Sequence, residues 1–134
     1  MKEDKDKNKE NGQICKLILI GESGVGKTCM IVRFITDEFN DTISTTGASY
    51  ASKYIYFDEC NKTIQYQIWD TAGQEKYRGL TKIFYKDAQI VILVYDVTRR
   101  NTFDEIKNYW YNQIKENAAE EISKKKLFTF NFLL

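Results

Sequence analysis

Residues 21–28 read Gly-Glu-Ser-Gly-Val-Gly-Lys-Thr, which fits the spacing G-x-x-x-x-G-K-[ST]. The apolar run 14–20 before this segment has the pattern of a strand, and residues 27–36 after it have the pattern of a helix. Glycine permits positive φ, so successive N–H groups can curl around an anion at the start of the helix. A chance glycine-rich turn is the alternative, but both flanks favour a phosphate-binding loop.

The lysine and threonine that close this phosphate loop (residues 21–28) indicate the class of ligand, a nucleoside triphosphate with Mg²⁺. Lys27 would carry positive charge to the β- and γ-phosphates, and the Thr28 hydroxyl would ligate the metal ion. The predicted phosphate contacts are consecutive residues: Gly21, Glu22, Ser23, Gly24, Val25, Gly26, Lys27, Thr28 and Cys29.

A second segment predicts related chemistry. Asp70 ends a strand-like stretch, and Gly73 and Gln74 follow it closely. The Asp70 carboxylate could hold a Mg²⁺-bound water, the Gly73 N–H could approach the γ-phosphate, and Gln74 could orient an attacking water. Alone, this segment could be an Asp-Thr helix cap with a turn glycine. Beside a phosphate loop it predicts catalytic roles for Gln74, Lys27 and Gly73, and metal contacts by Thr28 and Asp70.

Strand and helix patterns alternate along the chain, which predicts an α/β P-loop fold with a mostly parallel sheet. Residues 48–57 and 63–70, separated by a polar turn, predict an antiparallel hairpin at the sheet edge. The continuously apolar residues 90–95 predict a central strand. Thr102 and Glu105 form a capping box that predicts the start of a further helix. The apolar residues on one face of that helix are typical of a core: Phe103, Ile106, Trp110 and Ile114.

Length and composition set further limits. The 134 residues are enough for one domain, and a net charge of +1 gives no global sign of nucleic-acid binding. The chain has no histidine, so catalysis would proceed without an imidazole base. Three well-separated cysteines without metal-site spacing suit a reducing, cytoplasmic environment. The expected organisation is a disordered polar arm at 1–12, the domain at 13–119 and an atypical tail at 120–134.

With both segments in view, the sequence resembles a small GTPase of the Ras superfamily, specifically of the Rab family. The resemblance covers residues 14–118 and implies GTP or GDP and Mg²⁺ as ligands. It implies that Thr45 closes onto Mg²⁺ in the triphosphate state and that Phe39 packs against the guanine edge. Ser44 or Thr46 could replace Thr45, but the register to the next glycine favours Thr45. The resemblance is carried by residues 21–28, 44–48, 69–78, 95–98 and 102–103.

The resemblance also implies a molecular switch. Residues 37–47 and 71–83 would be ordered by the γ-phosphate and Mg²⁺ and released after hydrolysis. Exchange factors, GTPase-activating proteins and effectors would bind these two segments. Because no arginine finger is identifiable in the chain, hydrolysis would be slow until an activating partner supplies the charge. The implied role is that of a monomeric switch in vesicle traffic.

The resemblance ends after residue 118, so the domain is expected to be truncated after its third helix. Neither the family's base-reading Asn-Lys-x-Asp sequence nor its prenylated C-terminal cysteines occur in the chain. Residues 127–134 fit a partial fifth strand or unrelated sequence. The alternative function is therefore a non-cycling fragment, a pseudo-GTPase or decoy, with weak and poorly base-selective nucleotide binding. An unrelated P-loop phosphotransferase or ATPase is disfavoured by the segment around Asp70.

Overall fold

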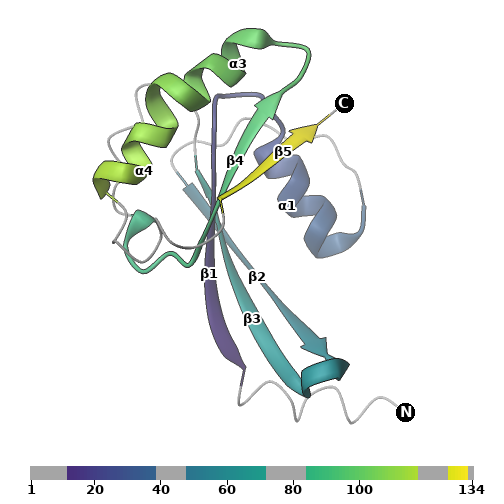
Figure 1. Cartoon of the computed structure of the whole chain (residues 1–134). Coiled ribbons are helices and arrows are strands. Elements are labelled where there is room, and N and C mark those ends of the chain that lie inside the picture. The colour runs from purple at the N-terminus through teal and green to yellow at the C-terminus, as the bar shows by residue number, and fades with distance from the viewer. Residues whose placement is uncertain (1–11, 39–47, 72–83, 118–126, 133–134) are drawn as a thin grey trace.

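The computed structural model describes residues 12–38, 48–71, 84–117 and 127–132, the last range as a strand only. Figure 1 shows the chain as a sheet with helices on both of its faces. The elements in chain order are β1 (Gln13–Ile20), α1 (Lys27–Thr36), β2 (Ala48–Phe57), the 3₁₀ turn η1 (Asp58–Cys60), β3 (Lys62–Thr71), β4 (Ile90–Asp96), α3 (Arg100–Glu105), the π-helical turn η3 (Ile106–Trp110), α4 (Tyr111–Asn117) and β5 (Leu127–Phe132).

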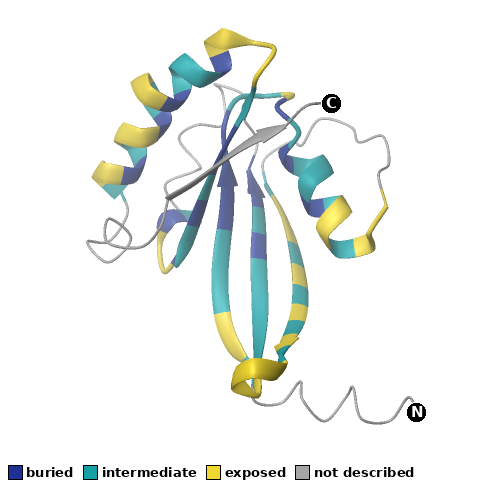
Figure 2. Ribbon diagram, turned by 45° about the vertical axis from the view of Figure 1, so that its right-hand side comes forward, coloured by how far each residue is buried: buried dark blue, intermediate teal, exposed yellow. Residues whose placement is uncertain are grey.

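The five strands form one sheet in the order β2-β3-β1-β4-β5. Strands β2 and β3 pair antiparallel along their whole length, and the remaining neighbours pair parallel. The mostly parallel sheet and its antiparallel edge hairpin are therefore confirmed. The hairpin continues past the helices, and its far end at η1 is exposed (Figure 2). The residues of 127–132 pair with β4, as expected for a partial fifth strand.

The sheet separates two apolar cores because alternate residues of its central strands point to opposite faces. Ile18 and Ile20 of β1 pack toward η3 and α4, together with Trp110 and Ile114. Leu19, on the other face, packs with residues of the phosphate loop, α1 and the neighbouring strands. The apolar second half of β1 and the apolar run of β4 are suited to this burial on both faces. The two cores hold the carboxyl ends of the strands in fixed positions.

The helix after β4 contains one π-helical turn, and the spacing of its buried residues explains why. Thr102, Ile106, Trp110 and Ile114 are all buried and lie four residues apart. In an ideal α-helix, a four-residue spacing turns by about 40° more than one full turn, so the stripe would drift off the core. At η3 the Tyr111 N–H donates to the Ile106 carbonyl, an i→i+5 bond that widens one turn. The wider turn keeps the buried residues on one face.

The predicted capping box at the start of this helix is wrong. Helix α3 begins at Arg100, so Thr102 lies inside its first turn. The Thr102 hydroxyl instead donates toward the carbonyls of Asp96 and Arg99 and accepts from the Asp96 N–H. These bonds join the end of β4 to the first turn of the helix, so the hydroxyl serves this connection rather than a cap at Thr102.

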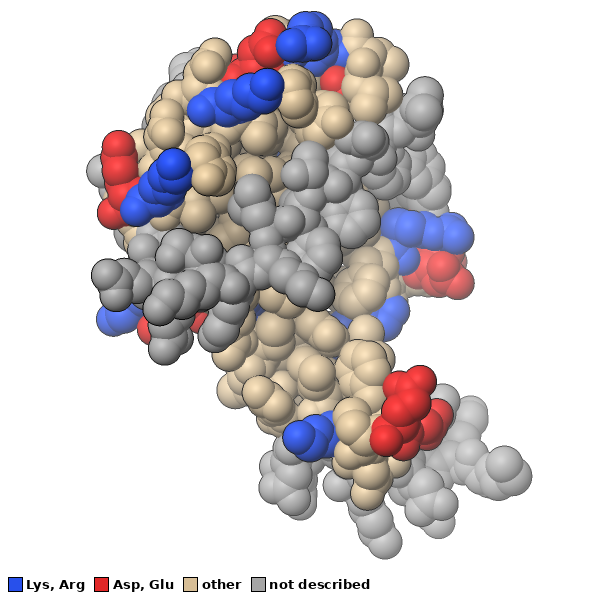
Figure 3. Space-filling view, in the orientation of Figure 1, with Lys and Arg blue, Asp and Glu red and all other residues tan. Residues whose placement is uncertain are grey.

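Within the residues described, no helix is long and apolar enough to span a membrane. On the face drawn in Figure 3, acidic and basic side chains are interspersed, in keeping with the near-neutral net charge. The expected disordered arm and most of the two expected switch segments lie outside the described residues.

Candidate phosphate-binding site

The phosphate loop leaves the sheet where the strand order reverses. Strand β1 has β3 on one side and β4 on the other, and the chain runs from its carboxyl end directly into the loop. In open α/β sheets this switch point leaves a crevice in which ligands bind. The site is therefore built from the carboxyl ends of β1, β3 and β4 and the start of α1.

Glycines at two ends of the loop are required by its geometry. A Cβ on Gly21, where φ is +148°, would lie 2.1 Å from the Val94 carbonyl oxygen. The loop therefore begins in direct contact with the β4 backbone. Gly26 has φ +90° and immediately precedes α1 as its N-cap. These two positions fix where the loop leaves the sheet and where the helix begins.

Lys27 is folded back over the start of the loop. Its Nζ donates to the carbonyls of Gly21 at 2.9 Å and Glu22 at 2.8 Å, and the residue is only 6% exposed. Burial lowers the pKa of the ammonium to about 8, because the carboxylates of Asp70 and Glu22 only partly offset the loss of hydration. A bound phosphate would supply the negative charge that this buried ammonium lacks. The geometry and the electrostatics both fit an anion at this position.

Thr28 and Asp70 meet across the crevice. The Thr28 hydroxyl in the first turn of α1 donates to the Asp70 carboxylate at 2.5 Å. Asp70 is almost fully buried near the end of β3, and the Thr71 hydroxyl beside it bonds the Leu19 carbonyl at 2.7 Å. This bond ties the end of β3 to β1 and so holds Asp70 opposite the helix. The pair is separated by 42 positions in the sequence but forms one group in space.

The donor set fits Mg²⁺. Magnesium prefers oxygen ligands, keeps several waters and is commonly held by one or two protein groups together with phosphate oxygens. A hydroxyl and a carboxylate beside an anion-binding loop provide that chemistry. Thr28 and Asp70 would hold the ion, which would offset part of the negative charge of the phosphates.

The structure brings the loop residues and Asp70 together. Ser23 is half-buried within the loop, and Cys29 is half-buried in the first turn of α1, next to Thr28. The remaining predicted site residues lie outside the described part of the chain and stay predictions: Phe39, Thr45, Gly73 and Gln74.

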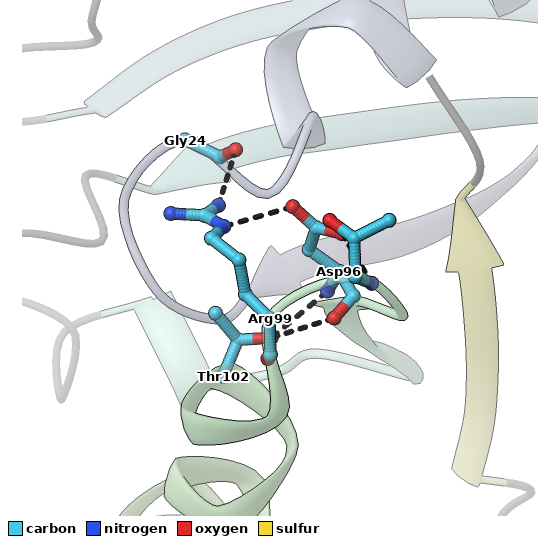
Figure 4. Close-up of polar contacts among 5 residues, drawn as sticks. Gly24, Asp96, Arg99 and Thr102 are labelled. Atoms are coloured by element: carbon cyan, nitrogen blue, oxygen red, sulfur yellow. Dashed lines mark hydrogen bonds and ion pairs between the residues drawn. The ribbon is translucent and has the colours of Figure 1, made fainter.

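Two residues that the sequence did not single out for the site also contact the loop. Arg99, between β4 and α3, donates from Nη2 to the Gly24 carbonyl at 2.7 Å and from Nε to Asp96 at 2.8 Å (Figure 4). Trp110 of η3 donates from Nε1 to the Glu22 carboxylate at 3.1 Å. The helical spacing marked Trp110 only as core, and no local motif marks Arg99. Both contacts depend on β4 lying beside β1.

The Asp96 carboxylate that orients Arg99 is itself held in place. Thr98 donates to Asp96 Oδ1 from its N–H at 2.8 Å and from its hydroxyl at 2.6 Å. These bonds from Thr98, followed by the bond from Arg99, lower the pKa of the Asp96 carboxyl to about 2. Asp96 is therefore ionised at neutral pH and carries the negative charge that orients Arg99.

The sheet has helices on both faces and a phosphate loop at its switch point, with a buried lysine and a Thr–Asp pair beside the loop. These features define the class of P-loop nucleotide-binding domains. Within this class, the family model for the Ras family matches residues 16–127. The human Ras-related protein Rab-8B and the mouse Ras-related protein Rab-8A are each 48% identical over 110 residues, covering 81% of this chain. The chain belongs to the Ras family and is of the Rab type, which confirms the resemblance. It spans about half the length of these relatives, 52% in each case.

Proposed function

We propose that this chain is the phosphate- and Mg²⁺-binding part of a Rab-type small GTPase, which binds GTP or GDP and hydrolyses GTP slowly. The observation that carries this proposal is the meeting of Lys27, Thr28 and Asp70 at the carboxyl ends of β1 and β3. Each has the charge or donor type that a Mg²⁺–triphosphate requires. The similarity to Rab relatives supports a guanine nucleotide as the ligand.

In this mechanism the chain's own groups bind and orient the phosphates. The loop N–H groups and the positive end of α1 would face the β-phosphate, and Lys27 would neutralise the β- and γ-phosphates. Thr28 and Asp70 would hold Mg²⁺, which supplies charge stabilisation when bound. Gln74 would orient the attacking water and the Gly73 N–H would contact the γ-phosphate, as the family resemblance implies. Thr45 would complete the metal contacts, and Phe39 would pack against the base.

The cellular role that fits this site is a switch in membrane traffic at the cytosolic face of endomembranes. Residues 37–47 and 71–83 would carry the contacts to exchange factors, GTPase-activating proteins and effectors. Residues 71–83 begin at Thr71, which ends β3 next to Asp70, and residues 37–47 begin at the end of α1 that points away from the phosphate loop. Contacts with the γ-phosphate and Mg²⁺ would couple both segments to the ligand, as the family resemblance implies.

A second candidate is a non-cycling form with weak, poorly base-selective binding. These 134 residues contain no Asn-Lys-x-Asp to read the base, so on their own they would bind nucleotide without that contact. A site that hydrogen-bonds a polar group can discriminate by several orders of magnitude, and this selectivity is lost with the group.

One titration tests the proposal and separates the two candidates. The chain is titrated with fluorescent GTP and ATP analogues, with Mg²⁺ and with EDTA, and turnover is then measured. Mg²⁺-dependent binding that Lys27→Ala abolishes supports the proposed site, whereas binding unaffected by this change contradicts it. Lys115→Ala, which removes the same charge from an exposed position of α4, is the matched control. Strong GTP preference with turnover favours the cycling GTPase, and equal binding of both analogues without turnover favours the non-cycling form.

A further inference from the structure

Arg99 lies against the outside of the phosphate loop at Gly24. Its Nη2 donates to the Gly24 carbonyl at 2.7 Å (Figure 4). A Cβ built on Gly24 would lie 3.6 Å from Nη2 and 3.9 Å from Nη1, so the guanidinium packs over this glycine as well as bonding it. The contact joins residues 75 positions apart in the sequence.

This bond fixes the orientation of one peptide unit. In a planar trans peptide the C=O and the following N–H point in opposite directions. When Arg99 holds the Gly24 carbonyl outward, the Val25 N–H points to the opposite side of the peptide plane. In a phosphate loop that side faces the anion. The Val25 side chain is buried in the core beneath α1, so the peptide is held at a second point.

The guanidinium is oriented before any ligand binds. Asp96 accepts from Nε at 2.8 Å and is itself locked by Thr98. A guanidinium offers several donors in a rigid planar arrangement, so one end can bond a carboxylate while the other bonds a carbonyl. The flexible lysine ammonium lacks this fixed geometry.

The neighbouring arginine does not share this position. Arg100 pairs with Asp104 of its own helix at 3.1 Å and stacks over Phe103. Two adjacent residues of the same type thus have different partners, and within the described residues only the first of them, Arg99, is bonded to the phosphate loop. Arg100 therefore provides a control with the same change of charge.

We propose that Arg99 is a positioning residue that sets the affinity of the phosphate loop by fixing the Gly24–Val25 peptide for phosphate binding. This inference rests on the proposed function. Arg99 acts through the loop backbone rather than by touching the nucleotide. Without the Arg99 side chain the Gly24–Val25 peptide can rotate. Nucleotide binding must then order this peptide, and the lost conformational entropy weakens the affinity.

The test compares Arg99→Ala, Arg99→Lys and Arg100→Ala in the full chain. With GDP and Mg²⁺, Arg99→Ala should weaken binding on the order of tenfold, which corresponds to about 1.4 kcal/mol. Arg99→Lys should recover part of this loss, and Arg100→Ala should stay near the wild-type affinity. The ³¹P resonance of the bound β-phosphate should shift in Arg99→Ala alone, which a general loss of stability would not produce. Equal losses in Arg99→Ala and Arg100→Ala, or an unchanged ³¹P resonance, overturn the proposal.

A second measurement needs no nucleotide and keeps the two proposals distinguishable. In the free protein, the ¹³C resonance of the Gly24 carbonyl and the ¹⁵N resonance of Val25 should move in Arg99→Ala and not in Arg100→Ala. If the wild-type chain binds no nucleotide, the proposed function fails, and these resonances alone decide whether Arg99 orients the peptide. If nucleotide binds but neither the affinity nor the resonances respond to Arg99→Ala, only the positioning role fails.

Discussion

Trp110 donates a hydrogen bond from its indole nitrogen to the Glu22 carboxylate at 3.1 Å, joining the π-helical turn η3 to the second residue of the phosphate loop. The indole is fully buried in the core between the sheet and α3–α4. The indole nitrogen thus contacts the phosphate loop at Glu22 from the buried core, whereas Arg99 contacts the loop at Gly24. The helix that follows β4 is thereby part of the support of the loop.

Trp110→Phe tests the energetic contribution of this bond. The change keeps most of the ring but removes the donor to a carboxylate, so the free energy of unfolding should fall by about 2 kcal/mol, with a smaller share from the lost ring volume. Urea unfolding followed by circular dichroism measures the difference.

Trp69→Phe is the matched control for this change. The Trp69 indole nitrogen is buried and has no hydrogen-bond partner among the described residues. Its replacement loses ring volume without losing a described bond, so it should cost less than Trp110→Phe. Equal costs for the two variants would contradict the assigned role of the Trp110–Glu22 bond.

The depressed pKa of Lys27 predicts a dependence of stability on pH. The folded protein holds this ammonium at a pKa of about 8 against an ordinary 10.5, so the unfolded chain binds more protons between these values. The free energy of unfolding of the nucleotide-free protein should therefore rise as the pH increases through this window, by on the order of 1 kcal/mol between pH 7 and pH 9. Urea unfolding of wild type and Lys27→Met across this range isolates the contribution, which should be missing in the variant. Parallel pH profiles would contradict it.

Nucleotide binding should show the opposite trend. Phosphate favours the charged form of Lys27, so binding would raise its pKa and take up a proton above about pH 8. Affinity for GDP should consequently weaken as the pH rises from 8 to 10. Titrations of wild type at several pH values, with Lys27→Arg as a permanently charged comparison, measure this. The same pH dependence in Lys27→Arg would exclude Lys27 as its source.

Thr28→Ala should reduce the contribution of Mg²⁺ to nucleotide affinity. The change removes a metal ligand and the partner of Asp70 but leaves the loop backbone intact. The ratio of GDP affinities with Mg²⁺ and with EDTA should fall on the order of tenfold, the equivalent of about 1.4 kcal/mol. Thr36→Ala at the end of the same helix, where the hydroxyl bonds only the Val32 carbonyl and the Glu38 N–H among described groups, should leave the ratio unchanged. An unchanged ratio in Thr28→Ala would refute the assigned metal contact.

Gly21→Ala should disrupt the fold at the base of the loop. The new Cβ would lie 2.1 Å from the Val94 carbonyl oxygen, at a backbone φ that favours glycine. Neither strand can move without disturbing both cores, so a loss of about 3 kcal/mol or more is expected, or failure to fold. Gly12→Ala is the control, since its nearest neighbours are 3.7 Å away. Melting temperatures and soluble yield report the difference, and similar values for the two variants would contradict the predicted contact.

The local sequence pattern predicts most of the helices and strands correctly. Strands β2 and β4, helix α1 and the edge hairpin lie within one or two residues of their predicted bounds, because turn chemistry and apolar runs mark them directly. The start of α3 did not follow. A capping box at Thr102 was expected from spacing, but its hydroxyl is committed to the end of β4. A spacing signal fails here because the bond to the end of β4, six residues away, takes the hydroxyl that the capping pattern would use.

The phosphate loop is predictable from spacing alone, because positive φ at glycine and a lysine at the start of a helix are local requirements. The distant residues that support that loop depend on the placement of β3 and β4 on either side of β1. This placement brings Asp70, which the sequence already marks, opposite Thr28, and it alone reveals Arg99 on Gly24 and Trp110 on Glu22. Strand order is settled by packing of both sheet faces at once, and no short segment of the chain encodes it.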